Sequence, residues 1–339
     1  MIAKPSNHSV GFLIPYFGYW PRWSRLFFQS CESNRAITVI LICEYIPPFS
    51  LPSNVRVIKM DRAETIARLE KATGLTLSDV SGHKLCDFRP FFALAFAEIL
   101  EDYEYWGYCD VDMMFGDLNK LLTPEFFDST DIFTASESGF AGHFTILRND
   151  PIINRSCFKM EGWQERCLSP SWQGMDEWWF FAAINTESSI RIQRPASLGE
   201  ELNKSFGRFG LTFGFRGEVA YLKHYDVPLV RWENGSVFYT SQSGKATEML
   251  YIHFMGLKQW WHWRFFADTK PSRQVHRFSR LGYGGPSQVR RLSKFPWLQM
   301  FWAQSVISYL KRSAGRKLRG ILAAEDFLRL RRFLFGGSR

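Results

Sequence analysis

The first half of the chain alternates between apolar runs and amphipathic stretches, and this alternation predicts an α/β fold. His8–Tyr16 and Ala36–Cys43 are largely apolar, and the second is rich in β-branched residues, as is typical of strands covered on both faces. Trp23–Ser33 has its apolar residues at helical spacing. By the same criteria we predict strands at Asn54–Met60, Tyr105–Asp110, Ile132–Ser136 and Phe144–Leu147, and helices at Ala63–Thr73 and Arg89–Glu101.

Strands that alternate with helices in this way predict a mainly parallel central sheet with right-handed crossovers. Such sheets bind ligands beyond the carboxyl ends of their strands, and Asp110 and Asp112 follow one of these ends. Neither G-x-G-x-x-G nor G-x-x-x-x-G-K-[ST] follows the first predicted strand. The sequence therefore does not suggest a dinucleotide oxidoreductase or a P-loop enzyme.

Asp110 and Asp112 form an Asp-x-Asp pair at the end of the aromatic strand Tyr105–Asp110. Residues two apart in extended backbone point to the same side, roughly 6–7 Å apart, so the two carboxylates converge. Such a pair suits Mg²⁺ or Mn²⁺, which keep open positions for phosphate oxygens. An acidic surface turn is the structural alternative. An aspartyl phosphatase is a second, although Met114 stands where its motif has Thr or Val.

Length, composition and charge limit the number of domains and the possible partners of the protein. The chain has 339 residues, of which 46% are hydrophobic, so it can build one large α/β domain or two smaller ones. The N-terminus lacks the apolar run of a signal peptide, and no segment offers the ~20 apolar residues of a spanning helix, which predicts a cytoplasmic protein. The net charge is +9, and residues 290–339 alone hold 12 Lys and Arg against 2 Asp and Glu.

The basic C-terminal region predicts a second part of the chain. We expect a main domain over 1–265 and a basic, aromatic-rich helical tail over 266–339. Basic helices with Trp, Phe and Leu on one face lie on anionic membranes, and this favours a membrane-surface role for 290–339. Nucleic acid is disfavoured as a partner, because the aromatic residues cluster with Leu and Ile and are not spaced as a stacking platform. A helical hairpin packed on the main domain is the structural alternative.

Several segments together resemble the GT-A glycosyltransferases, in particular a bacterial family of polysaccharide-biosynthesis transferases. The segments are Ile14–Gly18, Ser30–Asn34, Lys84–Pro90, Trp106–Asp112 and Phe115–Asp117. The resemblance implies a GT-A fold and a nucleotide-sugar donor, with a divalent cation joining Asp112 and Asp110 to its diphosphate.

The same resemblance implies that Lys84 and Arg89 contact the donor and that Asp87 orients them or meets the sugar. A salt bridge between Lys84 and Asp87 at a helix start is the structural alternative.

A second match lies at Tyr251–Trp260, which is similar to the His-Phe-x-Gly-x-x-Lys-Pro-Trp signature of glycogenin-like and lipopolysaccharide-galactosyltransferase-like enzymes. It implies that His253 is a third metal ligand and that Gly256 and Lys258 hold the diphosphate. The gap from Gly to Lys is one residue shorter here, and Gln259 replaces the Pro. The alternative for His253 is a core histidine beside aromatic residues.

Gln173–Phe180 contains an acidic pair, Asp176 and Glu177, of the kind that faces the acceptor or serves as base in many GT-A enzymes. The alternative is a helix N-terminus, where acidic residues are favoured by the helix dipole. We expect Gly142 to give the donor sugar room to approach the backbone, and the adjacent His143 to be either a donor-site contact or a surface-loop residue.

These patterns predict an enzyme, a divalent-cation-dependent glycosyltransferase. It would use Mn²⁺ or Mg²⁺ to transfer a hexose from a UDP-sugar to a cell-surface polysaccharide or lipid-linked glycan, at the inner face of the plasma membrane. Two other classes stay open: a catalytically inactive nucleotide- or glycan-binding protein, and a membrane or nucleic-acid adaptor that acts through its basic tail.

Overall fold

A computed structural model describes residues 8–21, 23–78, 80, 82–195, 210–212, 229–240, 246–253, 275–279 and 282–284. The chain divides into units of residues 1–285 and 286–339, and every described residue belongs to the first. The predicted membrane segment, 290–339, therefore lies outside the described residues. No helix in the described ranges combines the length and apolar character needed to cross a bilayer.

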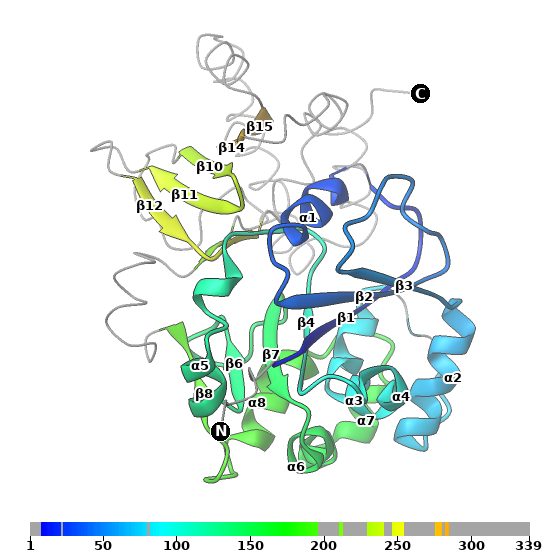
Figure 1. The fold of residues 1–339 in the computed structure, drawn as a ribbon. Coiled ribbons are helices and arrows are strands. Elements are labelled where there is room, and N and C mark those ends of the chain that lie inside the picture. Colours follow the sequence, from blue (N-terminus) through cyan, green and yellow to red (C-terminus); the bar gives the residue numbers. More distant parts are fainter. Residues whose placement is uncertain are drawn as a thin grey trace, which may run out of the picture. The chain divides into compact units, whose positions relative to one another are not determined.

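A seven-stranded sheet forms the centre of the first unit, with strand order β3-β2-β1-β4-β7-β6-β8 (Figure 1). The first four of these strands are mutually parallel, β7 runs antiparallel to β4 and to β6, and β8 is parallel to β6. The predicted mainly parallel α/β sheet is confirmed. The strands are β1 Val10–Tyr16, β2 Ile37–Cys43, β3 Val55–Lys59, β4 Tyr105–Cys109, β6 Ile132–Thr134, β7 Phe144–Arg148 and β8 Ile192–Gln193.

Helices cover both faces of this sheet, as the near-continuous apolar strands require. Alternate residues of β1 enter two cores: Leu13 packs with α2, α3, α4 and α8, whereas Phe12 and Ile14 pack with α1 and α5. Figure 1 shows α1 on the opposite side of the sheet from α2, α3 and α4. The helices are α1 Ser24–Cys31, α2 Arg62–Thr73, α3 Phe92–Ala95, α4 Ala97–Leu100, α5 Pro124–Ser129, α6 Pro151–Arg155, α7 Trp163–Leu168 and α8 Phe180–Ile184.

One predicted helix is broken into three pieces. The pattern over Arg89–Glu101 predicts a single helix, but the 3₁₀ helix η1, Lys84–Phe91, precedes α3, and Phe96 separates α3 from α4. Pro90 lacks a backbone N–H, and Phe96 leaves helical geometry with φ −127° and ψ 33°. The side chain of Arg89 therefore comes from a tight turn.

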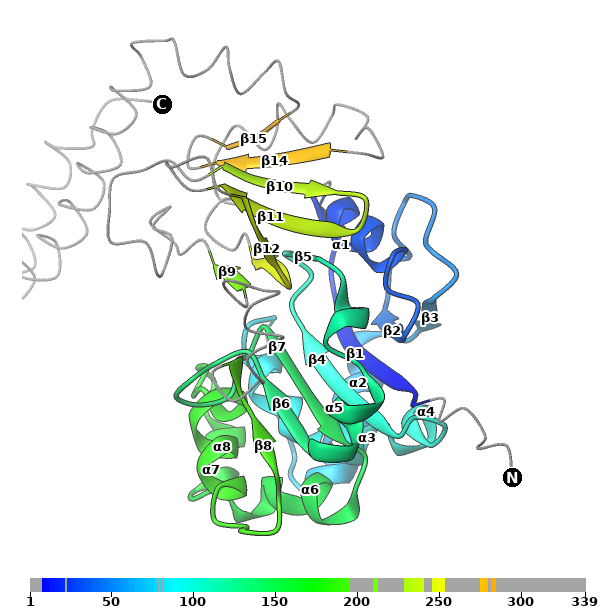
Figure 2. The ribbon, with the colours of Figure 1, turned by 60° about the vertical axis from the view of Figure 1, so that its left-hand side comes forward.

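Two smaller sheets follow the central one (Figure 2). The three-stranded sheet has the order β5-β13-β9, from Met113–Phe115, Tyr251–His253 and Gly210–Thr212. The five-stranded sheet has the order β12-β11-β10-β14-β15, from Ala246–Met249, Ser236–Thr240, Leu229–Glu233, Val275–Ser279 and Gly282–Gly284.

The last two strands of the five-stranded sheet correct one expectation. β14 and β15 lie inside 266–339, which the sequence predicts to be a helical tail. β14 pairs with β10, so residues 275–284 add to a sheet. The boundary at residue 265 and the helices expected further on stay predictions.

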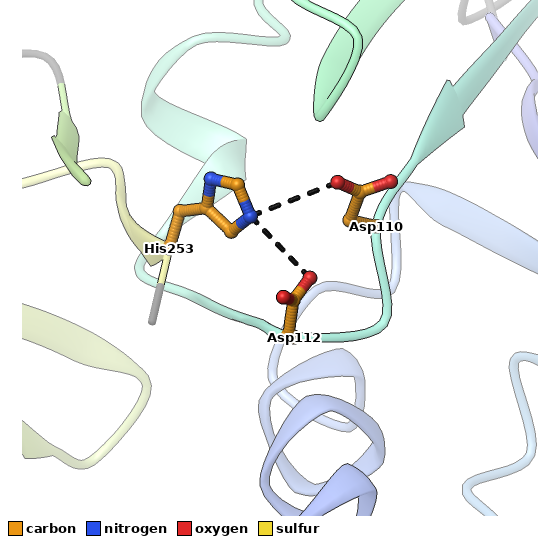
Figure 3. Close-up of side chains that lie close together, drawn as sticks. All are labelled: Asp110, Asp112 and His253. Carbon is orange, nitrogen blue, oxygen red and sulfur yellow. Dashed lines mark ion pairs between the residues drawn. The ribbon is translucent and has the colours of Figure 1, made fainter. Parts of the chain in front are cut away.

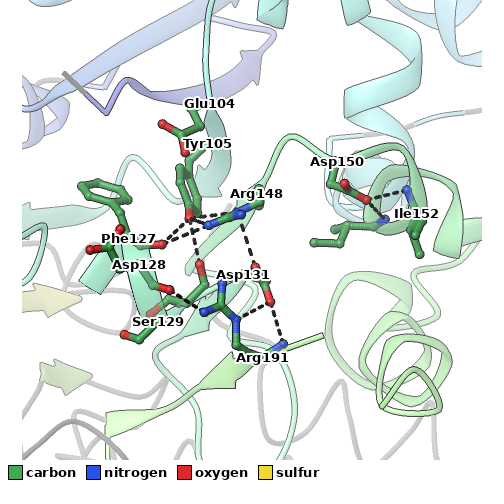
Figure 4. Close-up of polar contacts among 12 residues, drawn as sticks. Glu104, Tyr105, Phe127, Asp128, Ser129, Asp131, Arg148, Asp150, Ile152 and Arg191 are labelled. Atoms are coloured by element: carbon green, nitrogen blue, oxygen red, sulfur yellow. Dashed lines mark hydrogen bonds and ion pairs between the residues drawn. The ribbon is translucent and has the colours of Figure 1, made fainter. Parts of the chain in front are cut away.

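An ion-pair network attaches β8 to the rest of the central sheet (Figure 4). Asp131 accepts bonds from the backbone N and the guanidinium of Arg191, each at 2.9 Å, and lies 3.4 Å from Arg148. Arg148 in turn donates to the Tyr105 hydroxyl at 2.8 Å. Hydrogen bonding from Arg191 lowers the pKa of Asp131, so this carboxylate stays charged.

Candidate metal centre and active site

Asp110 and Asp112 lie in the short connection between β4 and β5, at the carboxyl end of a central strand. β5 pairs antiparallel with β13, and the register places Met113 opposite His253. This pairing brings a residue about 140 positions downstream beside the Asp-x-Asp segment. The three side chains point toward one another (Figure 3).

The three side chains offer ligand atoms that all lie within 4.8 Å of one another, the only such group of three or more in the described part of the chain. His253 Nε2 is 3.3 Å from Asp112 Oδ1 and 3.6 Å from Asp110 Oδ2. The side chains of Asp112 and His253 are each 4% exposed, whereas that of Asp110 is 31% exposed. The cluster is therefore open to solvent on the Asp110 side.

The imidazole of His253 is buried without the partners that a buried imidazole needs. Within the described residues, both ring nitrogens lack a hydrogen-bond partner. Leaving a buried polar group unpaired costs about 1–3 kcal/mol, so such groups call for an explanation. A cation between His253 and the two carboxylates would supply the missing partner, and two oxygens with one imidazole nitrogen form a suitable ligand set.

The segment after the Asp pair is fixed by polar residues at the end of α1. Asn34 donates from Nδ2 to the Gly116 carbonyl at 2.8 Å and accepts from the Leu118 N–H at 2.7 Å. Ser30 accepts from the Phe115 N–H at 2.9 Å. These bonds explain why Ser30–Asn34 and Phe115–Asp117 occur together in the sequence resemblance: the first segment holds the second in place.

Arg89 joins the metal cluster to the acidic pair. Its guanidinium donates to Asp110 Oδ1 at 2.5 Å, to Asp176 Oδ2 at 2.8 Å and to the Gly142 carbonyl at 2.6 Å. Four predicted site residues therefore meet at one point. Arg89 is held by protein partners and is also close enough to the opening to meet an anionic ligand.

Lys84 and Asp87 hold the loop that carries the acidic pair. They form a buried ion pair at 2.9 Å, with side chains 1% and 0% exposed. Asp87 also accepts from the N–H groups of Gln173 at 2.7 Å and Met175 at 2.9 Å. The salt bridge expected as the structural alternative for this pair is therefore present, and a contact of either residue with a donor stays a prediction.

Asp176 and Glu177 lie in a π-helical turn, Met175–Trp179, which follows Gly174 at φ 69°. Asp176 is buried, and burial raises its pKa against the opposing effect of Arg89. Burial and the neighbouring Asp176 raise the pKa of Glu177 to about 7. A carboxylate poised near neutrality is suited to accepting a proton.

Gly142 lies directly beneath both carboxylates. A Cβ at this position would be 2.8 Å from Glu177 Oε1 and 3.0 Å from Asp176 Oδ2, so any larger residue would displace them. The next residue, His143, stacks on His253 with 4.6 Å between ring centroids. Gly256 and Lys258 lie outside the described residues, and their roles stay predictions.

Sequence reasoning gave no role to Tyr251, whose hydroxyl is 2.8 Å from His143 Nε2. The spacing could have indicated that Tyr251 belongs to the site, because it is two residues before His253 in a strand and the two side chains therefore lie on the same face.

The fold and the site define an α/β protein with a candidate divalent-cation centre at the carboxyl end of its central sheet. Residues 12–275 match the model of the family described as "Family of unknown function (DUF6625)". The chain belongs to this family. A comparison with curated proteins gave no match.

Solved structures similar to the chain include several glycosyltransferases. Mouse xyloside xylosyltransferase 1 in its apo form is 14% identical with a TM-score of 0.36, over 55% of this chain and 84% of that one. The galactosyltransferase LgtC with donor and acceptor sugar analogues is 12% identical with a TM-score of 0.32, over 64% and 80%. The glycosyltransferase GlyE of Streptococcus pneumoniae TIGR4 is 12% identical with a TM-score of 0.30, over 55% and 44%.

Proposed function

We propose that the protein is a GT-A-type glycosyltransferase that depends on a divalent cation. The observation that supports this most directly is His253, a buried imidazole without a hydrogen-bond partner in the described chain, facing Asp110 and Asp112. A buried core histidine would be expected to have a partner, and an acidic surface turn would not include a buried Asp112.

Asp110, Asp112 and His253 would hold Mn²⁺ or Mg²⁺. The mixed oxygen and nitrogen ligands favour Mn²⁺, which accepts imidazole more readily than Mg²⁺ does. A bound cation would neutralise charge on a nucleotide diphosphate as it leaves. We propose UDP as that nucleotide, with Arg89, Gly256 and Lys258 as the cationic and backbone contacts to the donor.

Glu177 is the better placed of the two carboxylates to face the acceptor. Asp176 is 1% exposed and bound to Arg89, whereas Glu177 is half-buried and has no ion pair with a cationic side chain among the described residues. With a pKa of about 7, Glu177 can accept a proton from an acceptor hydroxyl near neutral pH. Arg89 would keep Asp176 and Asp110 at a constant separation during transfer.

The acceptor we propose is a cell-surface polysaccharide or a lipid-linked glycan at the cytoplasmic face of the membrane. The support is the sequence alone, namely the excess of 12 basic over 2 acidic residues in 290–339 beside clusters of Trp, Phe and Leu.

The test is calorimetric titration of UDP into the protein with Mn²⁺ and again with EDTA. We expect binding that needs the metal, loss of that binding in Asp112→Asn, and wild-type binding in the control Asp128→Asn, which changes an exposed carboxylate. A screen of UDP-sugars for UDP release would then identify the donor. Equal UDP binding with and without Mn²⁺ would contradict the metal assignment, and binding without release from any sugar would favour a non-catalytic binding protein.

A further inference from the structure

His143 connects the two chain segments that bring the ligands of the candidate metal centre together. Its carbonyl accepts the backbone N–H of Asp110 at 3.2 Å, which holds the end of β4. Its imidazole stacks on that of His253, with ring centroids 4.6 Å apart and planes 19° from parallel. One residue therefore touches Asp110 through its backbone and His253 through its side chain.

Tyr251 holds the imidazole of His143 in that stack. The Tyr251 hydroxyl lies 2.8 Å from His143 Nε2, and the Tyr251 ring stacks on Phe144 at 5.8 Å. Tyr251 and His253 share one face of β13, so this strand presents both contacts to His143.

Within the described part of the chain, His253 lacks the usual support of a metal-binding histidine. A ligating imidazole normally donates its second ring N–H to a carboxylate or carbonyl, which fixes the plane of the ring. His253 Nε2 faces the two aspartates, and its Nδ1 is buried without a hydrogen-bond partner in the described residues. Among the described residues, the ring is therefore oriented by packing, and His143 supplies a flat, parallel surface for it.

We propose that His143 is a positioning residue of the metal centre, which fixes the plane of His253 by stacking and thereby sets the affinity for the cation. This inference rests on the proposed function, because it requires that the cluster binds a cation. His143 is not among the three residues whose ligand atoms converge in the described chain, so its action is through His253.

Stacking and hydrogen bonding can be separated by substitution. His143→Ala removes both contacts, and His143→Leu replaces the flat ring with a side chain of similar bulk. His143→Phe keeps a flat ring but cannot bond to Tyr251, and Tyr251→Phe removes the same bond from the other side. His83→Ala is the matched control, since it removes an exposed imidazole that stacks on Trp172 instead.

In the experiment, Mn²⁺ is titrated into the full chain without nucleotide. Binding is measured by calorimetry and by the electron paramagnetic resonance spectrum of bound Mn²⁺. We expect His143→Ala and His143→Leu to weaken Mn²⁺ binding about 10- to 100-fold, the usual effect of losing a residue that orients a ligand. His143→Phe and Tyr251→Phe should stay within about threefold of wild type, because one net hydrogen bond contributes little. Thermal melting of each metal-free variant identifies any loss of folding.

Three results would overturn the proposal. Wild-type affinity in His143→Leu would show that the stack does not matter. An equal, large loss in His143→Phe and His143→Ala would show that an imidazole nitrogen of His143, and not the flat ring, is the important group. Failure of the wild-type chain to bind Mn²⁺ or Mg²⁺ would instead contradict the metal centre itself, and the proposal with it.

Discussion

Gly116 is the position at which a single added methyl group should have the largest consequence for the site. A Cβ there would lie 2.5 Å from the Met249 carbonyl oxygen and 3.0 Å from that of Leu250. Both atoms are backbone, so neither can rotate away as the end of a side chain could. Gly116→Ala must therefore push β5 away from the segment that leads into β13.

The cost can be estimated from the bonds at this position. The Gly116 N–H donates to the Leu250 carbonyl at 2.6 Å, and the Gly116 carbonyl accepts from Asn34 at 2.8 Å. The added carbon would stand 0.9 Å inside the 3.4 Å at which ordinary contact begins, so both bonds should lengthen or break. Two buried hydrogen bonds lost with unpaired groups left behind cost about 2–6 kcal/mol.

Urea unfolding of Gly116→Ala and wild type measures this cost, with Gly82→Ala as control, because a Cβ at Gly82 meets nothing within 4 Å. We expect Gly82→Ala to match wild type. Because β5 and β13 carry the Asp pair and His253, Gly116→Ala should also weaken Mn²⁺ binding. A free energy of unfolding within about 0.5 kcal/mol of wild type would refute the close approach of these segments.

Three further outcomes follow from the geometry. Gly142→Ala should slow UDP-sugar turnover about tenfold or more, because the new Cβ would lie 2.8 Å from Glu177 Oε1 and 3.0 Å from Asp176 Oδ2 and would displace both carboxylates. An unchanged rate would contradict this packing. With the pKa of Glu177 raised to about 7, turnover should rise with pH through that value, and a pH profile of Glu177→Gln should lose the rise. Asp131→Asn should lower the free energy of unfolding at pH 7 by about 1–3 kcal/mol, because it breaks the contacts with Arg191. Since the folded pKa of Asp131 is lowered, its stabilisation is present above the ordinary value of 3.8 and disappears as pH falls through the folded pKa, so urea curves of variant and wild type should converge in strong acid.

The sequence was most informative about features that depend on residues close together in the chain. The apolar run of β2 and the aromatic run of β4 lie where the hydrophobic pattern places strands, because side-chain periodicity follows directly from backbone geometry. The Asp pair at the end of β4 was predicted for the same reason. The single helix expected over Arg89–Glu101 failed because Pro90 and the geometry at Phe96 interrupt it, which apolar spacing alone does not reveal.

Residue type was less informative about function where the same kind of side chain can serve several different roles. A lysine beside an acidic residue fits both a donor contact and an internal ion pair, and only the structure shows that Lys84 forms a buried ion pair with Asp87. Asp176 and Glu177 are adjacent and chemically alike, yet Arg89 binds the first and leaves the second half-buried with a raised pKa. The two carboxylates differ only in their surroundings in the folded protein, and the local sequence pattern does not contain that information.

The sequence by itself predicted strands β1, β2, β3, β4, β6 and β7, a mainly parallel sheet and two carboxylates at a strand end, because hydrophobic periodicity and the alternation of strands with helices can be read along the chain. Only the tertiary structure decided that His253 lies beside Asp112, that Arg89 spans Asp110 and Asp176, and that His143 stacks on His253. The contacts of His253 depend on the register of β5 with β13 and on a close approach at Gly116. Long-range register is set by packing and backbone hydrogen bonds between distant segments, and a local hydrophobic pattern does not contain that information.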